Sequence, residues 1–201
     1  NVVLFPDQQL PLHIFEPRYR QLVRDMLEGS PYVVIARIVG DAGVEPARFT
    51  RVCTVGRLAA HQRLSDGRYN ILLEGAVRVE AVELEGESDR PYRRVRCDAI
   101  AEPYGASAVV PPSERIAMLS LLSLVLQAAR AKEPGVEFAP PASLEPAKLA
   151  YRIADRFFSD GALRQRVLEA PDARARVACV TEGLAQRLSE LGPPATRARS
   201  S

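Results

Sequence analysis

The sequence is poor in the residue types that build most metal and nucleophilic sites. Its two histidines, His13 and His61, stand in no metal-binding motif and flank no carboxylate pair. The three cysteines, Cys53, Cys97 and Cys179, are odd in number, lie far apart and form no CxxC pair. Scattered cysteines of this kind are typical of free thiols in a reducing compartment. We therefore expect no metal site, no cofactor and a cytoplasmic location.

Lysine is equally scarce, and tryptophan is absent. Lys132 and Lys148 are the only lysines, and no serine has a histidine or lysine at the spacing of a nucleophilic site. The phosphate-binding loop GxxxxGK[ST] does not occur, so the sequence predicts neither a nucleotide site nor a catalytic residue. No apolar run approaches the roughly 18 residues that a membrane-spanning helix needs, and no membrane partner is expected.

Charge of one sign does not dominate either half of the chain. The formal net charge is +2, with a balance of −1 over residues 1–102 (14 Arg against 15 Asp and Glu) and of +3 over residues 103–201. Neither half has the basic footprint of a nucleic-acid-binding domain, so the charge argues against a nucleic-acid partner. The chain begins with Asn rather than Met, and we expect a short N-terminal piece to precede it.

The most informative segment of the sequence is a predicted strand-to-helix corner near the start of the chain. Pro11 and Pro17 lack a backbone donor and punctuate the segment, and Pro17 suits the first turn of a helix. Glu16 precedes that turn, where a carboxylate is favoured. Apolar residues then recur at helical spacing up to Gly29, which can end the helix; they are Tyr19, Leu22, Val23, Met26 and Leu27.

Residues 1–102 are predicted to be rich in strands. After the corner, strands are expected over 32–39 (buried), 52–64, 69–84 and 92–100. Gly56 predicts a bulge, the apolar phase slips again between Ala81 and Val82, and Asp66-Gly67 predicts a tight turn. Five or six strands joined by short turns, with one helix, indicate a mostly antiparallel sheet or small barrel.

The second half is predicted to be helical. Residues 103–112 have the composition of a linker, 113–192 form a helical lobe, and 193–201 form a disordered tail. Four helices are expected, with Ser113 capping the first and Asp172 opening the last. The first helix is predicted to bury one apolar stripe, formed by Ile116, Leu119, Leu122, Val125, Leu126 and Ala129.

Several of these phrases resemble one known family. The opening "LFP…LPLHIFEPRYR…M" is similar to the start of the Lon N-terminal domain, the substrate-recognition module of Lon-type ATP-dependent proteases, and "LAYRIADRF" (149–157) and "RQRVLEAPDARARV" (164–177) resemble its helical part. The resemblance implies an α+β fold, namely a PUA-like antiparallel β pseudo-barrel with one helix followed by a four-helix C-terminal lobe. The residues that match the family pattern are Pro11, His13, Phe15, Glu16, Arg18, Tyr19, Gly67, Gly75 and Arg78.

The resemblance also implies a function. Because the sequence contains no ATPase or Ser-Lys protease motif, it looks like a stand-alone Lon N-terminal-domain protein that is not an enzyme. We expect it to bind unfolded or degron-bearing polypeptides, or to act as an adaptor in protein turnover with a separate Lon protease. Two alternatives stay open: an RNA-binding PUA-like protein, and a small-molecule-binding sensor with a cleft near His13, Glu16 and Arg78.

Exposed aromatic residues near loops are the candidates for polypeptide contacts. A peptide can add to a sheet edge or lay apolar side chains in a groove between the lobes. The candidates are Phe15, Tyr19, Phe49, Tyr69, Tyr92 and Tyr104. Arg18 and Glu16 are expected to form an ion pair with each other or with the strand that carries Arg78. That pair and the Asp66 turn are predicted to be structural.

Overall fold

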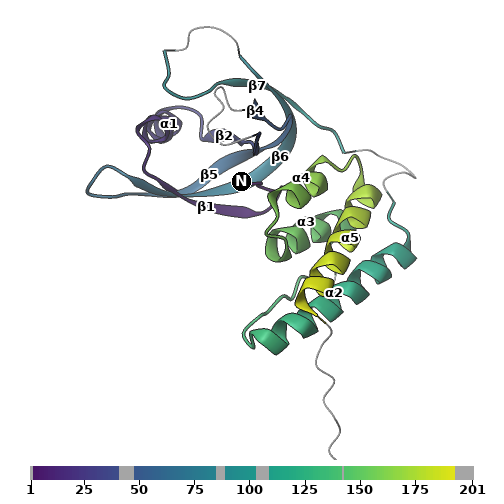
Figure 1. The fold of residues 1–201 in the computed structure, drawn as a ribbon. Coiled ribbons are helices and arrows are strands. Elements are labelled where there is room, and N and C mark those ends of the chain that lie inside the picture. Colours follow the sequence, from purple (N-terminus) through teal and green to yellow (C-terminus); the bar gives the residue numbers. More distant parts are fainter. Residues whose placement is uncertain (1, 41–47, 85–88, 103–108, 142, 193–201) are drawn as a thin grey trace, which may run out of the picture. The chain divides into compact units, whose positions relative to one another are not determined.

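The computed structural model describes residues 2–40, 48–84, 89–102, 109–141 and 143–192. It divides into two compact units, Asn1–Ala101 and Glu102–Ser201 (Figure 1). The N-terminal unit is built on an antiparallel sheet with one helix, and the C-terminal unit contains four helices. The predicted α+β class is therefore confirmed, with an antiparallel sheet and five helices among the described residues.

The main sheet of the N-terminal unit has five strands, and every pairing is antiparallel. They are β1 (Gln9–Ile14), β2 (Tyr32–Ile35), β5 (Val52–Arg63), β6 (Tyr69–Glu83) and β7 (Val95–Ala99). The order is β1-β6-β5-β2, and β7 pairs with the second half of β6. Two short strands, β3 (Ile38–Val39) and β4 (Arg48–Phe49), form a separate pair. Consecutive strands pair at β3–β4, β5–β6 and β6–β7, whereas β1 pairs with β6 and β2 pairs with β5.

The pairing of the long strands β5 and β6 has two irregularities, and the sequence predicted one of them. Their register shifts at Val55/Gly56, as expected from the glycine, and again at Leu58/Ala60. The slip predicted between Ala81 and Val82 is wrong, because β6 and β7 pair without interruption from Val79 to Glu83. Val82 is simply an apolar residue on the solvent side of the strand, 46% exposed.

Gly75 on β6 is the point where the N-terminal segment crosses the sheet. The Asp7 amide donates to the Gly75 carbonyl at 2.9 Å, and the Gly75 amide donates to the Gln8 carbonyl at 2.9 Å. A Cβ at this position would lie 2.0 Å from the Phe5 carbonyl oxygen, far inside van der Waals contact. Only glycine allows this crossing, which carries the buried Leu4 and Phe5 into the unit.

The helix α1 (Pro17–Glu28) covers one face of the sheet (Figure 1). It begins at Pro17 and ends before Gly29, as predicted from those two residues. The core beneath it is formed by buried residues of the helix, the N-terminal segment and β6: Leu4, Val23, Met26, Tyr69, Ile71 and Leu73.

The strand expected over 32–39 is split into β2 and β3, and it is not buried. Residues Val33 to Ile35 are partly buried, and Tyr32 is 50% exposed. The reason is the position of β2 at the end of the sheet order, where it pairs with β5 alone among the described strands. A run of Tyr, Val and Ile predicts a strand, but its burial depends on which neighbours the topology supplies.

In the C-terminal unit, the four helices pack mainly on the last one. They are α2 (Pro112–Lys132), α3 (Pro146–Phe157), α4 (Gly161–Glu169) and α5 (Ala173–Leu191), and α2 lies alongside α5 (Figure 1). The Asp160 and Asp172 carboxylates cap α4 and α5 by accepting from the Ala162 and Ala175 amides at 2.8 and 2.7 Å. Asp172 therefore opens the last helix as predicted.

Helix α2 differs from its prediction at both its start and its buried face. It begins at Pro112, so Ser113 lies inside the first turn and caps nothing. Ile116 and Leu119 of the predicted stripe are exposed, at 63% and 37%. Leu122 and Val125 of the predicted stripe are buried as expected, and the other buried residues are Met118 and Ala128, which the stripe did not include. Because nearly all positions from 116 to 129 are apolar or small, the sequence defines no single stripe, and packing on α5 selects the face.

Candidate functional site

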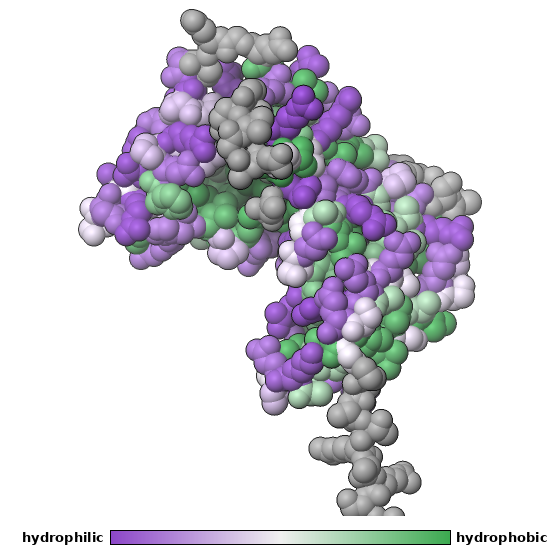
Figure 2. Space-filling view, viewed as in Figure 1, coloured by the Kyte–Doolittle hydropathy of each residue, from purple (hydrophilic) through white to green (hydrophobic). Residues whose placement is uncertain are grey.

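An apolar cleft of about 290 Å³ lies between α1 and the sheet of the N-terminal unit. Strands β1, β2 and β6 and helix α1 supply its walls. On the side of the molecule seen in Figure 2, the N-terminal unit shows apolar surface within a hollow. The cleft is lined by Leu12, His13, Ile14, Phe15, Glu16, Tyr19, Leu22, Val23, Met26, Val33, Val34, Ile35, Ile71 and Leu73.

Strand and helix periodicities explain why the cleft is apolar. Alternate residues of a strand face the same side of the sheet, so Leu12 and Ile14 of β1 share a face with Ile71 and Leu73 of β6. On α1, residues three and four apart share a face, which brings Leu22, Val23 and Met26 against the strands. The two apolar faces meet in the core but leave the cleft open at one side of the helix.

The rim of the cleft carries two exposed aromatic side chains. Phe15 is 61% exposed and Tyr19 is 37% exposed. The Phe15 ring stacks on the His13 imidazole with a centroid separation of 6.3 Å, and the Arg18 guanidinium lies 4.7 Å from the Tyr19 ring centroid. Exposed aromatic rings beside an apolar cleft are the usual anchors for a bound partner.

Glu16 and Arg18 neutralise each other at this rim. Their side chains form an ion pair at 2.9 Å, and both are about half exposed to solvent. Of the two partners expected for this pair, the structure therefore shows the local one rather than the strand of Arg78. A half-exposed pair of this kind contributes little to stability, about 0 to 1 kcal/mol.

His13 is held by neighbours on the far side of β1 from the cleft core. Its Nδ1 lies 2.7 Å from the Asn70 Oδ1, and its Nε2 lies 3.2 Å from an Arg68 guanidinium nitrogen. Arg68 in turn binds Asp66, and its hydrogen bond holds the pKa of the Asp66 carboxyl below its usual value. These contacts tie β1 to the β5–β6 turn, and Glu16 pairs with Arg18 instead of His13. The pattern is that of a structural tie and not of an acid-base pair.

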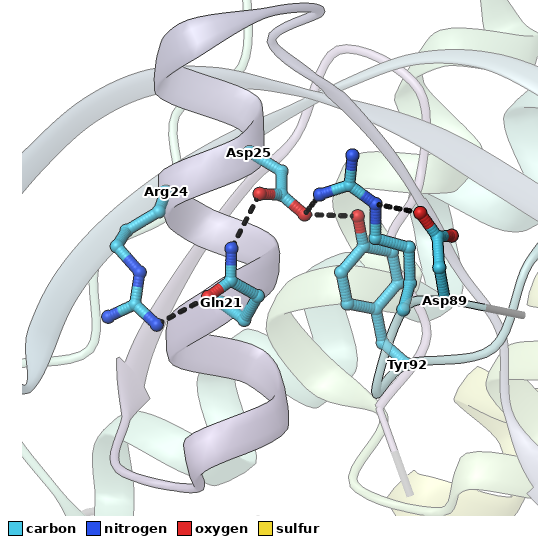
Figure 3. Close-up of polar contacts among 6 residues, drawn as sticks. Gln21, Arg24, Asp25, Asp89 and Tyr92 are labelled. Atoms are coloured by element: carbon cyan, nitrogen blue, oxygen red, sulfur yellow. Dashed lines mark hydrogen bonds and ion pairs between the residues drawn. The ribbon is translucent and has the colours of Figure 1, made fainter.

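The α1 wall of the cleft is fixed by a polar network centred on Asp25 (Figure 3). The Asp25 carboxylate accepts from the Tyr92 hydroxyl at 2.6 Å, from Arg90 at 2.7 Å and from Gln21 at 2.7 Å. The Tyr92 hydrogen bond, followed by the contacts to Gln21 and Arg90, lowers the pKa of Asp25. Burial, and then the same hydrogen bond, raises the pKa of Tyr92. The network joins the helix to the segment that precedes β7.

The predicted contact residues divide between the cleft and other roles. Phe15 and Tyr19 line the cleft. Phe49 packs on a separate cluster with Cys53 and Val79, beneath the Arg93 guanidinium at 4.8 Å. Tyr69 is only 3% exposed, as part of the core, so it offers no surface to a partner.

The two remaining candidates lie elsewhere. Tyr92 directs its hydroxyl to Asp25 and does not line the cleft. Tyr104 lies outside the described residues, as do most of the predicted linker and the predicted tail.

The residues matching the family pattern divide in the same way. His13, Phe15, Glu16 and Tyr19 line the cleft, and Arg18 pairs with Glu16 at its rim. The others shape the sheet: Gly67 has a positive φ of 81° in the β5–β6 turn, and Gly75 makes the crossing described above. Arg78 is 3% exposed on β6 and does not line the cleft, so the polar pocket of His13, Glu16 and Arg78 is not formed there.

Sequence reasoning does not identify most of the cleft lining. It places Leu22, Val23 and Met26 in the helix core, and Val33 and Ile35 in a buried strand. The signal that could have revealed the cleft is the broad apolar face of α1, which is wider than the β6 core needs. Only the tertiary arrangement shows that part of this face is left uncovered.

The cleft suits the binding of apolar side chains and not a reaction. Its titratable lining groups are His13, Glu16 and Tyr19, and none of them faces a nucleophile across the cleft. Within the described part of the chain, no group of three or more His, Cys, Asp or Glu side chains is placed to hold a metal ion. No described helix is both long and apolar enough to cross a membrane.

Comparison with known proteins gives one consistent family. Residues 1–186 match the model of the ATP-dependent protease La (LON) substrate-binding domain. The chain is 29% identical to Lon protease 2 of Syntrophobacter fumaroxidans over 95% of its length, and 25% identical to Lon protease 2 of Myxococcus xanthus over 90%. These alignments cover 24% and 22% of the two relatives, so the chain spans about a quarter of their length.

Solved structures show the same fold at low sequence identity. The N-terminal domain of the Mycobacterium avium complex Lon protease superposes with a TM-score of 0.66 at 13% identity, covering 94% of each chain. A Lon N-terminal domain protein from Xanthomonas campestris gives a TM-score of 0.59 at 18% identity, covering 91% of this chain and 92% of that chain. Together with the family match along nearly its full length, these findings establish that the chain belongs to the Lon substrate-binding domain family.

Proposed function

We propose that this protein binds polypeptide segments with exposed apolar side chains, and that the cleft between α1 and the sheet is the binding site. One observation carries the proposal: the unit leaves an apolar cleft open and flanks it with the exposed rings of Phe15 and Tyr19. Apolar surface of this kind costs free energy in water unless a partner covers it. A folded globular protein hides its own apolar side chains, so an unfolded segment is the partner that can supply them.

The size of the cleft favours modest affinity. Burying one large apolar side chain contributes about 1.5 to 3 kcal/mol, and a cleft of about 290 Å³ has room for only a few such side chains. Binding energy of this order, reduced by the ordering of the bound segment, corresponds to weak and reversible binding. This suits a module that must hold many different unfolded chains and release them.

The relatives support a role for this binding in protein turnover. They are Lon proteases, of which the matching part is the family's substrate-binding domain. We assign the chain the recognition of polypeptides and no catalytic step of its own. It delivers them to an ATP-dependent protease, acting either as an adaptor for a separate Lon protease or as the recognition part of a longer chain.

The test uses a permanently unfolded polypeptide as the probe. Fluorescently labelled, reduced and carboxymethylated casein should bind the nucleic-acid-free protein saturably. Phe15→Ala and Tyr19→Ala should each weaken binding by about tenfold, as expected for aromatic anchors. Val82→Ala is the matched control, since Val82 is a comparably exposed apolar residue outside the cleft lining. Absence of saturable binding, or equal loss in all three variants, would contradict the proposal, and retention of polypeptides only with RNA would favour the RNA-binding alternative.

A further inference from the structure

The two edges of the main sheet are built differently. β1 and β2 end the strand order β1-β6-β5-β2, and within the described residues neither has a second strand partner. β7 also pairs with β6 alone among the described strands, but none of its residues lines the cleft, so the comparison concerns the β1 and β2 edges. An unpaired edge presents backbone donors and acceptors to any extended chain, and proteins usually block it. Comparing the two edges shows which of them is blocked.

The β1 edge is blocked by a proline. The Gly75 amide donates to the Gln8 carbonyl, and this bond sets the phase of the β1–β6 ladder. In an antiparallel pair every second residue points its backbone groups at the partner strand, so Leu10, Leu12 and Ile14 face β6. Gln9, Pro11 and His13 face outward. Pro11 has no amide donor, so this edge cannot support a continuous ladder.

The β2 edge carries no such block. The Leu58 amide donates to the Pro31 carbonyl, and the register Tyr32↔Arg57 continues from it. By the same alternation Val33 and Ile35 face β5, whereas Tyr32 and Val34 direct their amide and carbonyl groups outward. The strand Tyr32–Ile35 contains no proline and no charged residue. Its outer edge can therefore accept another strand.

The open edge borders the apolar cleft. Val33 and Ile35 pack their side chains on the α1 side of the sheet, with the cleft core. Val34 packs its side chain on the opposite face, with Cys53 and Val79, and yet it also lines the cleft. The whole of the described strand β2 from Val33 to Ile35 therefore contributes to the cleft wall. Outward-facing amide and carbonyl groups and an apolar cleft thus meet along one strand.

We infer that a bound polypeptide adds to the outer edge of β2 as a further antiparallel or parallel strand. Main-chain hydrogen bonds to Tyr32 and Val34 hold it, and every second side chain enters the cleft beside Phe15 and Tyr19. This inference rests on the proposed function and specifies its ligand: an extended segment in which apolar residues alternate with others. Because the hydrogen bonds use only backbone groups, the site tolerates many sequences but requires the segment to be unfolded.

Backbone methylation of a peptide tests the inference directly. The probe is a short capped peptide in which leucine alternates with serine, and its control has the same composition with the leucines at helical spacing. The alternating peptide should bind at least about tenfold more tightly. Two methylated versions follow, one carrying N-methyl groups on the leucine amides and the other on the serine amides.

The phase of the added strand predicts opposite results for these two peptides. In a bound strand, either the leucine or the serine amides face β2, so one methylated peptide should lose binding by more than about tenfold and the other should keep it. Equal effects of the two methylations, or equal binding of the helically spaced control, would overturn the inference while leaving the proposed function intact. If neither casein nor the alternating peptide binds, the proposed function itself fails.

Amide hydrogen exchange gives a second readout on the protein side. Addition of the alternating peptide should slow exchange of the Val34 amide by at least about tenfold, because that amide gains a partner. The Ile35 amide already faces β5 and serves as the internal control. Unchanged exchange at Val34 under saturating peptide would overturn the inference. Slow exchange of this amide in the free protein, together with a concentration-dependent dimer, would also overturn it, because a second copy of the chain would then occupy the edge.

Discussion

The two units of the chain treat their apolar surface in opposite ways. The N-terminal unit leaves a cleft with apolar walls open beside α1 and exposes Phe15 at its rim. The C-terminal unit packs its helices on α5, and its own hollow of about 260 Å³ has mixed walls, with Lys132, Arg156 and Arg187 beside apolar residues. Even the arginine near the start of α5, Arg176, is 1% exposed.

Under the proposed function, the N-terminal unit is the binding unit and the C-terminal unit supports it. The N-terminal unit retains apolar surface whose burial by a partner would be favourable. The C-terminal unit buries one face of α2 but leaves Ile116 and Leu119 exposed, and its hollow is lined by both charged and apolar residues. We therefore expect substitutions in the first unit to separate into those that affect its fold and those that affect binding, whereas substitutions in the second should affect stability alone.

The largest effect is expected for Gly75→Ala in the N-terminal unit. The added methyl group would lie 2.0 Å from the Phe5 carbonyl oxygen, so the N-terminal segment must leave its place on β6. We expect a loss of about 4 kcal/mol in the free energy of unfolding, measured by urea denaturation followed by circular dichroism. Gly135→Ala is the control, since the methyl group added there would meet no atom within 4 Å and its effect should be near zero. Similar free energies of unfolding for the two variants would show that the N-terminal segment does not cross β6 at Gly75.

A smaller loss is expected for Arg176→Met in the C-terminal unit. The guanidinium lies 4.2 Å from the Tyr151 ring centroid and 3.0 Å from the Glu102 carboxylate, and methionine keeps only the apolar stem. Removing these contacts should cost about 2 kcal/mol. Arg166→Met removes an exposed pair with Glu182 and should cost less than about 0.5 kcal/mol. Equal melting temperatures for the two variants would show that Arg176 is not a core residue.

Tyr92→Phe should weaken the wall of the cleft. It removes the hydroxyl that donates to Asp25 at 2.6 Å, so the variant should unfold at a lower urea concentration than the wild type. Casein binding should weaken as well, because α1 loses a contact that holds it. Tyr32→Phe removes a hydroxyl from a half-exposed ring outside this network and should leave stability unchanged. A Tyr92→Phe protein as stable as the wild type would exclude a role for the network.

The smallest effect is the pH dependence of the same network. The pKa of Asp25 is lower in the folded protein than in the unfolded chain, so its carboxylate stabilises the fold above its unfolded pKa of about 4. This contribution is lost as the pH falls through the folded pKa. Asp25→Asn should therefore be less stable than the wild type near neutral pH, and the difference should shrink below about pH 4. Asp66 and Glu83 also have lowered pKa values, so the difference between the two proteins isolates Asp25. A difference that stays constant with pH would contradict the assignment.

Local sequence signals predicted the elements whose ends depend on their own residues. Helix α1 begins at Pro17 and ends before Gly29, and Asp172 caps α5. The glycine signal at Gly56 also predicted a register shift. In each case the physical cause lies within a few residues of the feature, since a missing donor, a capping carboxylate or an absent side chain acts on its own backbone.

Burial was predicted less well, because it depends on distant neighbours. Tyr69 was expected at a surface and lies in the core, whereas the strand at Tyr32 was expected in the core and lies at an edge. Helix α2 shows the same limit, since an almost continuously apolar stretch does not specify which face packs on α5. The buried and the exposed residues of this stretch are both apolar, so their side-chain chemistry does not distinguish them.

The sequence by itself determined the fold class, both ends of α1, the start of α5 and the family, because these follow from local periodicity, punctuating residues and a long matching phrase. The tertiary structure alone decided where the cleft is and what borders it. Its walls come from residues 12–35 together with Ile71 and Leu73, and its open edge exists only because β2 falls at the end of the strand order. Strand order is set by the packing of the whole unit, and no single segment of the chain contains that information.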